Sequence, residues 1–150
     1  MNDKIIGYIE NGIVIDHISL GKVFEIASLL DLGTQEGRVS LGEGYESGKI
    51  GKKGILKVEG MVLSNYEINL IALIAEHASV SIIKEGKIAD KYRTEIPNVL
   101  KGIVLCPNLA CISNDVNQMV ISLINFKDNL FKCHYCSKEF RKDELRLRKI

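Results

Sequence analysis

Cys106-Pro-Asn-Leu-Ala-Cys111 and Cys133-His-Tyr-Cys136 contain all four cysteines of the 150-residue chain. The first pair has the spacing C-x4-C, the second has C-x2-C, and 21 residues lie between the two pairs. This spacing lets four thiolates converge on one tetrahedral ion, and it predicts a single structural Zn²⁺ bound by Cys106, Cys111, Cys133 and Cys136. A shell of four thiolates leaves no open position for water, so we do not expect a catalytic metal.

Two disulfides or four free thiols are the alternative explanations of these cysteines. Disulfides belong to oxidising compartments, and the sequence opens without the cationic start and long apolar stretch of a signal peptide. No apolar run reaches the ~20 residues that a membrane-spanning helix needs. We therefore expect a cytoplasmic, zinc-binding protein that does not interact with membranes.

Composition divides the chain into two domains, which we place at residues 1–97 and 98–150. Twelve of the 13 glycines lie in the first segment, and all four cysteines lie in the second. The formal net charge is −3 for residues 1–97 and +4 for residues 98–150, so the whole chain carries only +1. This balance excludes a strongly cationic polyelectrolyte but allows a local basic patch. We expect the two domains to join near Ile96-Pro97-Asn98.

The second segment is expected to be a small antiparallel-β zinc domain. Three short stretches have the composition of strands: Ile103–Leu105, Met119–Ile124 and Asn129–Lys132. A segment of this size has a small apolar core, so the ion would supply much of its folding free energy.

Residues 1–97 contain several strand patterns rich in Ile, Val and Leu. They lie at Lys4–Glu10, Ile13–Ile18, Arg38–Leu41, Ile55–Val58 or its extension to Leu63, Val80–Ile83 and Lys87–Ala89. Asn11-Gly12 separates the first two, which form either a hairpin or one interrupted strand. Glu85-Gly86 separates the last two.

Two apolar stripes at helical spacing lie between these strands. Ser19 is placed to cap the first helix, Gly33 to end it, and Ser64-Asn65-Tyr66-Glu67 has the pattern of a capping box for the second. The stripes are Val23, Ile26, Ala27 and Leu30, then Ile68, Ile71, Ala72 and Ala75. The resulting order, β-α-β-β-α-β, predicts a ferredoxin-like α/β sandwich with both helices on one face of the sheet. The whole chain is then of the α+β class, and the other face of the sheet is free for a ligand or a partner.

Motifs for catalysis are weak. Gly44-Tyr-Glu-Ser-Gly48-Lys49 resembles a phosphate-binding P-loop, but it is one residue short, and Ile50 replaces the Ser or Thr that would bind Mg²⁺. We interpret the glycine-rich stretch from Gly42 to Gly54 as a mobile loop. Asp16 and His17 are adjacent, so regular strand alternation would place them on opposite faces. These observations favour a binding module over an enzyme.

Basic side chains recur in and beside the predicted strands of the first domain. They are Lys53, Lys57, Lys84, Lys87 and Lys91. Lysines on strands are often solvated edge residues, whereas several that converge could bind a polyphosphate. Asp16 ends an apolar strand, where it is either a turn residue or an acceptor for ribose hydroxyls.

Taken together, the chain resembles the regulatory chains of aspartate carbamoyltransferase along nearly its whole length. The C-P-N-x-x-C-I-S pattern followed by C-x-Y-C-x-K-E-F is much more specific than a generic zinc ribbon. The segments that carry the resemblance are Ile13-Val-Ile-Asp-His-Ile18, Ser47-Gly-Lys-Ile-Gly-Lys-Lys53, Lys57-Val-Glu59, Val104-Leu-Cys-Pro-Asn108, Cys111-Ile-Ser113 and Lys132-Cys-His-Tyr-Cys-Ser-Lys-Glu-Phe140.

The resemblance implies a non-catalytic subunit of an enzyme of pyrimidine biosynthesis. In that family the N-terminal domain binds nucleotide effectors, with CTP and UTP as inhibitors and ATP as activator, and it pairs with itself to form a homodimer. The C-terminal zinc domain binds the catalytic chains, and regulatory dimers bridge two catalytic trimers.

The resemblance also implies roles for individual residues. Asp16 would bind the ribose hydroxyls, Lys57 would lie between ribose and base, and Lys91 would bind the triphosphate with help from His17 and Lys53. The residues expected to frame the base are Tyr8, Ile9 and the segment from Ile83 to Ile88. Two positions depart from the family pattern, since Ser81 stands where many members have Asn and Gly86 stands where many have an aromatic residue.

The alternative function is a nucleic-acid-binding zinc-ribbon regulator with a ligand-sensing domain. Its support is the +4 charge of residues 98–150 and the basic tail from Arg141 to Lys149. That tail is equally explained as a solvated helix end with i,i+4 charge pairs. No basic stripe with interleaved aromatic residues accompanies it, so we do not expect nucleic acid as a partner.

Overall fold

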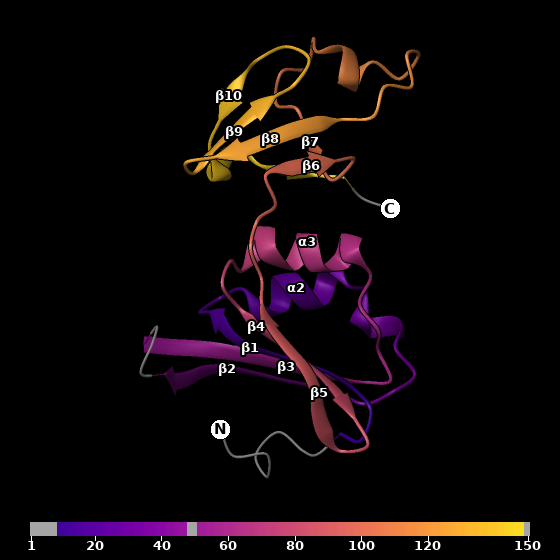
Figure 1. The fold of residues 1–150 in the computed structure, drawn as a ribbon, viewed down its shortest axis with the longest axis vertical. Helices are drawn as coiled ribbons and strands as arrows, with labels where there is room; N and C mark the ends of the chain where they lie inside the picture. Colours follow the sequence, from indigo (N-terminus) through magenta and orange to yellow (C-terminus); the bar gives the residue numbers. More distant parts are fainter. Residues whose placement is uncertain (1–8, 48–50, 149–150) are drawn as a thin grey trace. The chain divides into compact units, whose positions relative to one another are not determined.

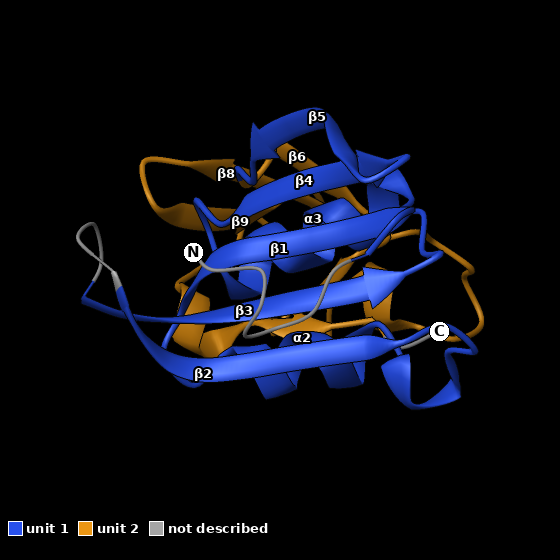
Figure 2. Cartoon of the chain, turned by 90° about the horizontal axis from the view of Figure 1, so that it is seen from below, with its two compact units in different colours: residues 1–95 blue, residues 96–150 orange. Residues whose placement is uncertain are grey.

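The computed structural model describes residues 9–47 and 51–148. The chain divides into two compact units, Met1–Glu95 and Ile96–Ile150, which we call unit 1 and unit 2 (Figure 2). The elements of unit 1, in chain order, are β1 (Gly12–Ser19), α2 (Val23–Leu29), the 3-10 turn η1 (Leu32–Thr34), β2 (Val39–Ser47), β3 (Gly51–Glu59), α3 (Asn65–Ile74), β4 (Ser79–Lys84) and β5 (Lys87–Arg93) (Figure 1).

Unit 1 is built on one five-stranded sheet with the order β2-β3-β1-β4-β5. Every pair of neighbouring strands is antiparallel. Both helices lie on the same face of this sheet (Figure 2). The prediction of a ferredoxin-like sandwich is confirmed, with β5 added beside β4.

The core of unit 1 lies between the sheet and the two helices. Alternate residues of β1, Ile13 and Ile15, are buried in it together with Val23 and Ile26 of α2 and Ile71 of α3. Because side chains alternate along a strand, the residues between them project from the opposite, helix-free face. We call this opposite face the polar face.

The start of α3 follows the predicted capping box. Ser64 Oγ accepts a hydrogen bond from the backbone N–H of Glu67 at 3.2 Å, and Glu67 Oε1 accepts one from the backbone N–H of Ser64 at 3.0 Å. The predicted cap of the first helix is wrong, because Ser19 pairs with Lys53 as the last residue of β1 and Lys22 occupies the N-cap. Gly33 also does not end that helix: α2 stops at Leu29, and Gly33 lies in the following 3-10 turn.

The glycine-rich stretch is mostly strand, so its interpretation as a mobile loop is wrong for the residues described. β2 continues through Gly42 and Gly44 to Ser47, and β3 begins at Gly51. A bulge between Gly42 and Tyr45 accommodates the extra residues, with Gly44 at φ 82°. Residues 48–50 lie outside the described part.

Three further differences concern strand ends in unit 1. Most of the predicted strand Lys4–Glu10 lies outside the described residues, and its last two, Ile9 and Glu10, are not in a strand. β3 ends at Glu59, because the chain turns at Gly60 with φ 77°. β5 extends four residues beyond the predicted end at Ala89, as far as Arg93.

Unit 2 contains a four-stranded antiparallel sheet with the order β10-β9-β8-β6 and a two-stranded sheet of β11 and β7. Its elements are β6 (Val99–Lys101), β7 (Val104–Leu105), η2 (Ile112–Asn114), β8 (Leu123–Lys127), β9 (Leu130–Cys133), β10 (Glu139–Phe140), η3 (Lys142–Glu144) and β11 (Arg146–Leu147). The expectation of a small antiparallel-β domain is confirmed.

The core of unit 2 contains a row of aromatic rings. Phe131 stacks on Phe140 with ring centroids 5.4 Å apart and contacts Phe126 at 4.6 Å. Leu100 and Ile124 pair across β6 and β8, and both are fully buried. This core is small, which agrees with the expected dependence of the unit on a metal ion.

Two sequence expectations for unit 2 are wrong. The strand predicted over Met119–Ile124 begins only at Leu123, because Met119 adopts φ 52° and its side chain is 89% exposed. The basic tail is not a helix end, since it forms the short turn η3 and then β11. Within the described ranges, no helix is long and apolar enough to cross a bilayer.

Candidate functional site

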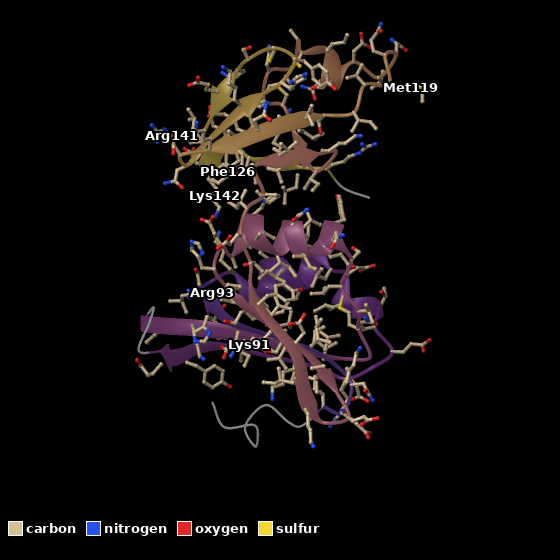
Figure 3. The ribbon with its side chains drawn as sticks, in the orientation of Figure 1. Lys91, Arg93, Met119, Phe126, Arg141 and Lys142 are labelled. Carbon is tan, nitrogen blue, oxygen red and sulfur yellow. The ribbon has the colours of Figure 1, made fainter. Side chains whose placement is uncertain are left out.

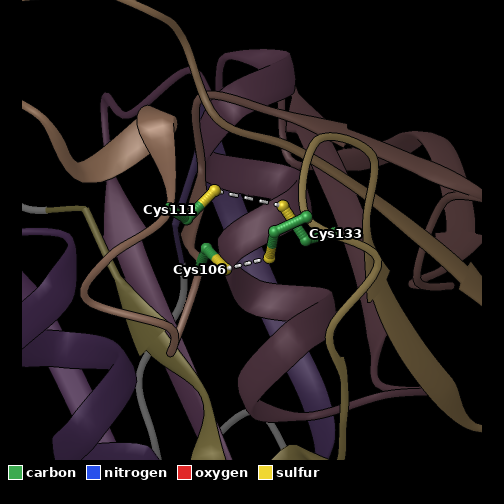
Figure 4. A group of neighbouring side chains, drawn as sticks. Cys106, Cys111 and Cys133 are labelled. Atoms are coloured by element: carbon green, nitrogen blue, oxygen red, sulfur yellow. Dashed lines mark hydrogen bonds between the residues drawn. The ribbon is translucent and has the colours of Figure 1, made fainter.

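The four cysteines of unit 2 form one cluster. Cys106 follows β7, Cys111 precedes η2, Cys133 ends β9, and Cys136 lies in the turn before β10. Their sulfur atoms all lie within 4.8 Å of one another, and the labelled side chains in Figure 4 converge on one point. The cluster predicted from the local cysteine spacing is therefore confirmed, and each sequence pair contributes two cysteines to it.

The sulfur separations fit a tetrahedral zinc ion. Cys106 Sγ lies 3.5 Å from Cys136 Sγ, and Cys111 Sγ lies 3.7 Å from Cys133 Sγ. Four sulfurs at the usual Zn–S distance of about 2.3 Å would be about 3.8 Å apart. A disulfide needs about 2.05 Å, and all four cysteines are free thiols. The donor set and its size fit one structural Zn²⁺.

Backbone N–H groups donate hydrogen bonds to the sulfurs of three of these cysteines, Cys106, Cys133 and Cys136. Burial raises the pKa of Cys106 and of Cys133, whereas the backbone N–H of Lys138 lowers the pKa of Cys136 to about 7. Cysteine thiols must lose their protons to bind metal as thiolates, so zinc uptake by the buried Cys106 and Cys133 is expected to release protons and to weaken as the pH falls. His134, between two ligands, is exposed and is not part of the cluster.

The second candidate site is the polar face of unit 1. One row of directly paired residues crosses the whole sheet, and its members are Ser40, Lys57, Val14, Ser81 and Lys91. Residues paired across antiparallel strands share a face. Lys57 and Lys91, which lie on β3 and β5, therefore project from the same side of the sheet, with Ser81 of β4 between them in the row.

A second row lies two residues along the strands, and it begins at Asp16 of β1. Asp16 pairs with Ser79 on β4, and Ser79 pairs with Arg93 on β5. Asp16 Oδ1 forms an ion pair with Lys53 Nζ at 2.8 Å, and both side chains are mostly buried. An acceptor carboxylate and a buried ammonium therefore lie beside the row that contains Lys57 and Lys91.

The structure corrects the expected arrangement of Asp16 and His17. A bulge in β1 lies between Ile15 and Ile18, and His17 adopts φ 57°. The backbone N–H of His17 consequently donates to Asp16 Oδ1 at 2.7 Å, and His17 Nδ1 lies 3.9 Å from Asp16 Oδ2. The bulge interrupts the alternation of side chains, so the side chains of Asp16 and His17 lie close together instead of on opposite faces.

The environment of Asp16 favours its charged form. Burial alone would raise the pKa of Asp16, but the hydrogen bond from Lys53, the N–H of His17 and the charges of both neighbours together lower it. Asp16 is therefore a carboxylate at neutral pH, and it is already held in place by Lys53.

The residues predicted to frame the base, and the lysines of the β4–β5 turn, do not all lie on the polar face. Ile83 is buried and pairs with Ile88, which is 59% exposed, one row along the polar face from Ser81. Ile9 is buried, and Tyr8 lies outside the described residues. Lys84 and Lys87 pair at the β4–β5 turn, next in sequence to Ile83 and Ile88, so alternation places them on the face that carries the helices.

Arg93 was missed by reasoning from the sequence. It shares a row with Asp16 and Ser79, so it projects from the polar face beside Lys91 (Figure 3). The signal available in the sequence was its position two residues after Lys91, which gives the same face in a continuous strand.

Comparisons with known proteins identify the family. Residues 4–95 match the family model described as the aspartate carbamoyltransferase regulatory chain, allosteric domain, and residues 98–146 match its metal binding domain. The chain belongs to the aspartate carbamoyltransferase regulatory chains. This confirms the resemblance and, because the family is one of regulatory chains, the expectation of a non-catalytic subunit.

Individual relatives with this name are similar over almost the whole chain. The one from Staphylothermus marinus is 42% identical over 148 residues, which cover 96% of this chain and 90% of the relative. The one from Pyrococcus abyssi is 38% identical over 148 residues and 97% of each chain. The one from Bacteroides fragilis is 37% identical over 138 residues, 91% of this chain and 90% of the relative. The matched metal binding domain contains the four-cysteine cluster, which supports a single structural zinc ion.

Proposed function

We propose that the polar face of unit 1 binds nucleoside triphosphate effectors, with CTP and UTP as inhibitors and ATP as activator. The observation that carries the proposal is the shared row of Lys57, Ser81 and Lys91 beside the Asp16–Lys53 ion pair. A nucleotide offers polyphosphate at one end and ribose hydroxyls next to it. Lysines suit the first as compact cations, and a carboxylate suits the second as an acceptor.

Each proposed contact uses a charge or donor that the fold holds in place. Lys91 is exposed on the edge strand β5 and would bind the phosphates, together with His17 and Lys53. Lys57 is 3% exposed and would lie between ribose and base. Asp16, kept ionised by its neighbours, would accept hydrogen bonds from the ribose.

The base would lie toward the β4–β5 turn. Ile83 and Ile88 give this end of the polar face an apolar character, and Gly86 in the turn adds no side chain. Ile9 and Tyr8 complete the proposed frame. With Ser81 and Gly86 in place of larger residues, discrimination between bases would depend on backbone groups.

We further propose that unit 1 forms a homodimer and that unit 2 binds the catalytic chains of a cytoplasmic aspartate carbamoyltransferase. The support for the second contact is three strongly exposed apolar residues that lie close in sequence to the first pair of cysteines. Leu109, Val116 and Met119, which lie within or shortly after the Cys106–Cys111 loop, are 77%, 88% and 89% exposed. Large apolar side chains with this much exposure are candidates for a surface that a partner covers.

The decisive experiment combines the chain with catalytic trimers from an aspartate carbamoyltransferase. Assembly measured by sedimentation, and substrate saturation curves measured with and without CTP, UTP and ATP, test partner and effectors separately. We expect assembly, and a shift of the curve by at least one nucleotide. Assembly with identical curves would remove the effector proposal, whereas binding of nucleic acid without assembly would favour the alternative regulator.

A further inference from the structure

The last strand of unit 2 lies beside the residues that lead into the metal site. β11 pairs with β7 in antiparallel fashion, with Arg146 opposite Leu105 and Leu147 opposite Val104. The backbone N–H of Arg148 also donates to the carbonyl oxygen of Ile103 at 2.8 Å. Because Cys106 directly follows Leu105, this register places Arg146 next to the first zinc ligand.

Two side chains donate hydrogen bonds to the carbonyl oxygen of Cys106. Arg146 Nη2 donates at 2.7 Å, and Asn114 Nδ2 donates at 2.8 Å. Asn114 Nδ2 also lies 2.8 Å from the carbonyl oxygen of Asn108, inside the Cys106–Cys111 loop. The loop that supplies two thiolates is therefore held by Asn114 of η2, which follows it, and by Arg146 of the C-terminal strand.

The charge of Arg146 suits this position. Four thiolates around Zn²⁺ leave a net charge of −2, and a guanidinium remains protonated at any working pH. A hydrogen bond from a charged donor is shorter and stronger than a neutral one, which agrees with the 2.7 Å distance. Arg146 is thus placed both to fix the Cys106 carbonyl and to offset the charge of the centre.

We propose that Arg146 is a positioning residue of the metal centre and that it makes zinc retention depend on the C-terminal strand. It acts through the Cys106 carbonyl and is not a metal ligand. A shift of the Cys106 backbone that carries its sulfur away from the ion would break the hydrogen bonds from Arg146 and Asn114, so these bonds oppose that route of release. The inference concerns the metal site alone and stands independently of the nucleotide proposal.

The test measures zinc release from the zinc-loaded full-length chain to a chromophoric chelator at fixed pH and ionic strength. Removing a hydrogen-bonded partner of a metal ligand typically costs 10–100-fold in metal affinity, so Arg146→Gln should accelerate release by roughly tenfold or more. Arg146→Lys, which keeps the charge and a donor group but not the planar guanidinium, should retain part of the wild-type zinc retention. Lys142→Ala is the matched control, since it removes the same charge from an exposed position of the same segment.

Two further measurements separate positioning from a general loss of structure. Cobalt-substituted Arg146→Gln should keep the absorption of four-thiolate coordination, and amides of β8 and β9 should stay protected from exchange while metal is bound. Asn114→Ala should also accelerate release, and its effect should not add to that of Arg146→Gln, because both act on one carbonyl. The proposal would be overturned if Arg146→Gln released zinc at the wild-type rate, or if Lys142→Ala accelerated release as much as Arg146→Gln does. It would also be overturned if the β8 and β9 amides of metal-bound Arg146→Gln lost their protection from exchange.

Discussion

At the scale of single residues, the polar face depends on a few charges whose environment the fold determines. Asp16 is the clearest example, because its carboxylate is bound by Lys53 at 2.8 Å and by the N–H of His17 at 2.7 Å. Neither contact follows from an ideal strand. The contact from His17 accompanies the bulge that gives His17 a positive φ, and the contact from Lys53 comes from the neighbouring strand β3.

Lys91→Ala should weaken nucleotide binding by roughly tenfold or more, because a charge-assisted contact to phosphate contributes about 1–3 kcal/mol. Isothermal titration calorimetry of the full-length chain with CTP and ATP measures this directly. Lys87→Ala is the matched control, since it removes the same charge from the same strand at the β4–β5 turn. Equal affinities for wild type and Lys91→Ala would remove Lys91 from the site.

The lowered pKa of Asp16 predicts how the stability of unit 1 changes with pH. A carboxyl group whose pKa is lower in the folded state stabilises the fold above its unfolded pKa, ordinarily near 3.9, and this contribution is lost as the pH falls through the folded value. Asp16→Asn should therefore be less stable than wild type at pH 7, and the difference should shrink below about pH 4.

Denaturant unfolding at a series of pH values, followed by circular dichroism, measures that difference. Glu36→Gln removes an exposed carboxylate and should show no comparable trend. If the difference in the free energy of unfolding between Asp16→Asn and wild type stayed constant down to pH 2, this would contradict the lowered pKa of Asp16.

At the scale of elements, neighbouring residues on one short strand can have opposite roles. On β6, Leu100 is fully buried and pairs with Ile124, while Val99 is 53% exposed and pairs with Asn125. Strand alternation explains the difference, since the two faces of this sheet are a core and a surface.

Leu100→Ala should lower the free energy of unfolding of unit 2 by about 2–5 kcal/mol, the usual cost of a cavity in a packed core. Val99→Ala should change it by less than about 0.5 kcal/mol. Hydrogen exchange of the β8 amides reports the stability of unit 2, and the β1 amides of unit 1 serve as an internal reference. Similar effects of the two substitutions would show that Leu100 is not a core residue.

At the scale of the whole molecule, the two units should respond differently to loss of metal. Unit 1 has a large apolar core between sheet and helices, whereas unit 2 has a small one centred on Phe131 and Phe140. An ion that binds only the folded form stabilises it by its binding free energy.

Cys111→Ser should therefore lose zinc, and unit 2 should lose protection from hydrogen exchange while unit 1 keeps it. Metal analysis and exchange mass spectrometry on the full-length chain measure both. If the proposed contact with catalytic chains is correct, this variant should also fail to assemble with them. A protected unit 2 without metal would contradict the role of zinc in folding.

The sequence by itself determined the features that depend on residues close together in the chain. The C-x4-C and C-x2-C spacings predicted the four members of the metal cluster, because each pair needs only one tight turn to bring two sulfurs together. The Ser64–Glu67 capping box is local in the same way, and it begins α3 as predicted. The spacing of apolar residues, which differs between strands and helices, predicted the order of the elements. That order in turn predicted the ferredoxin-like sandwich.

Only the tertiary structure decided which residues meet across strands. The bulge that joins Asp16 to His17, the continuation of β2 through Gly42 and Gly44, and the pairing of Arg146 with Leu105 all depend on partners far away in sequence. A bulge shifts register by one residue, and a shift of one residue moves a side chain to the other face of a sheet. Local patterns do not encode that shift, because it is set by how the neighbouring strand packs.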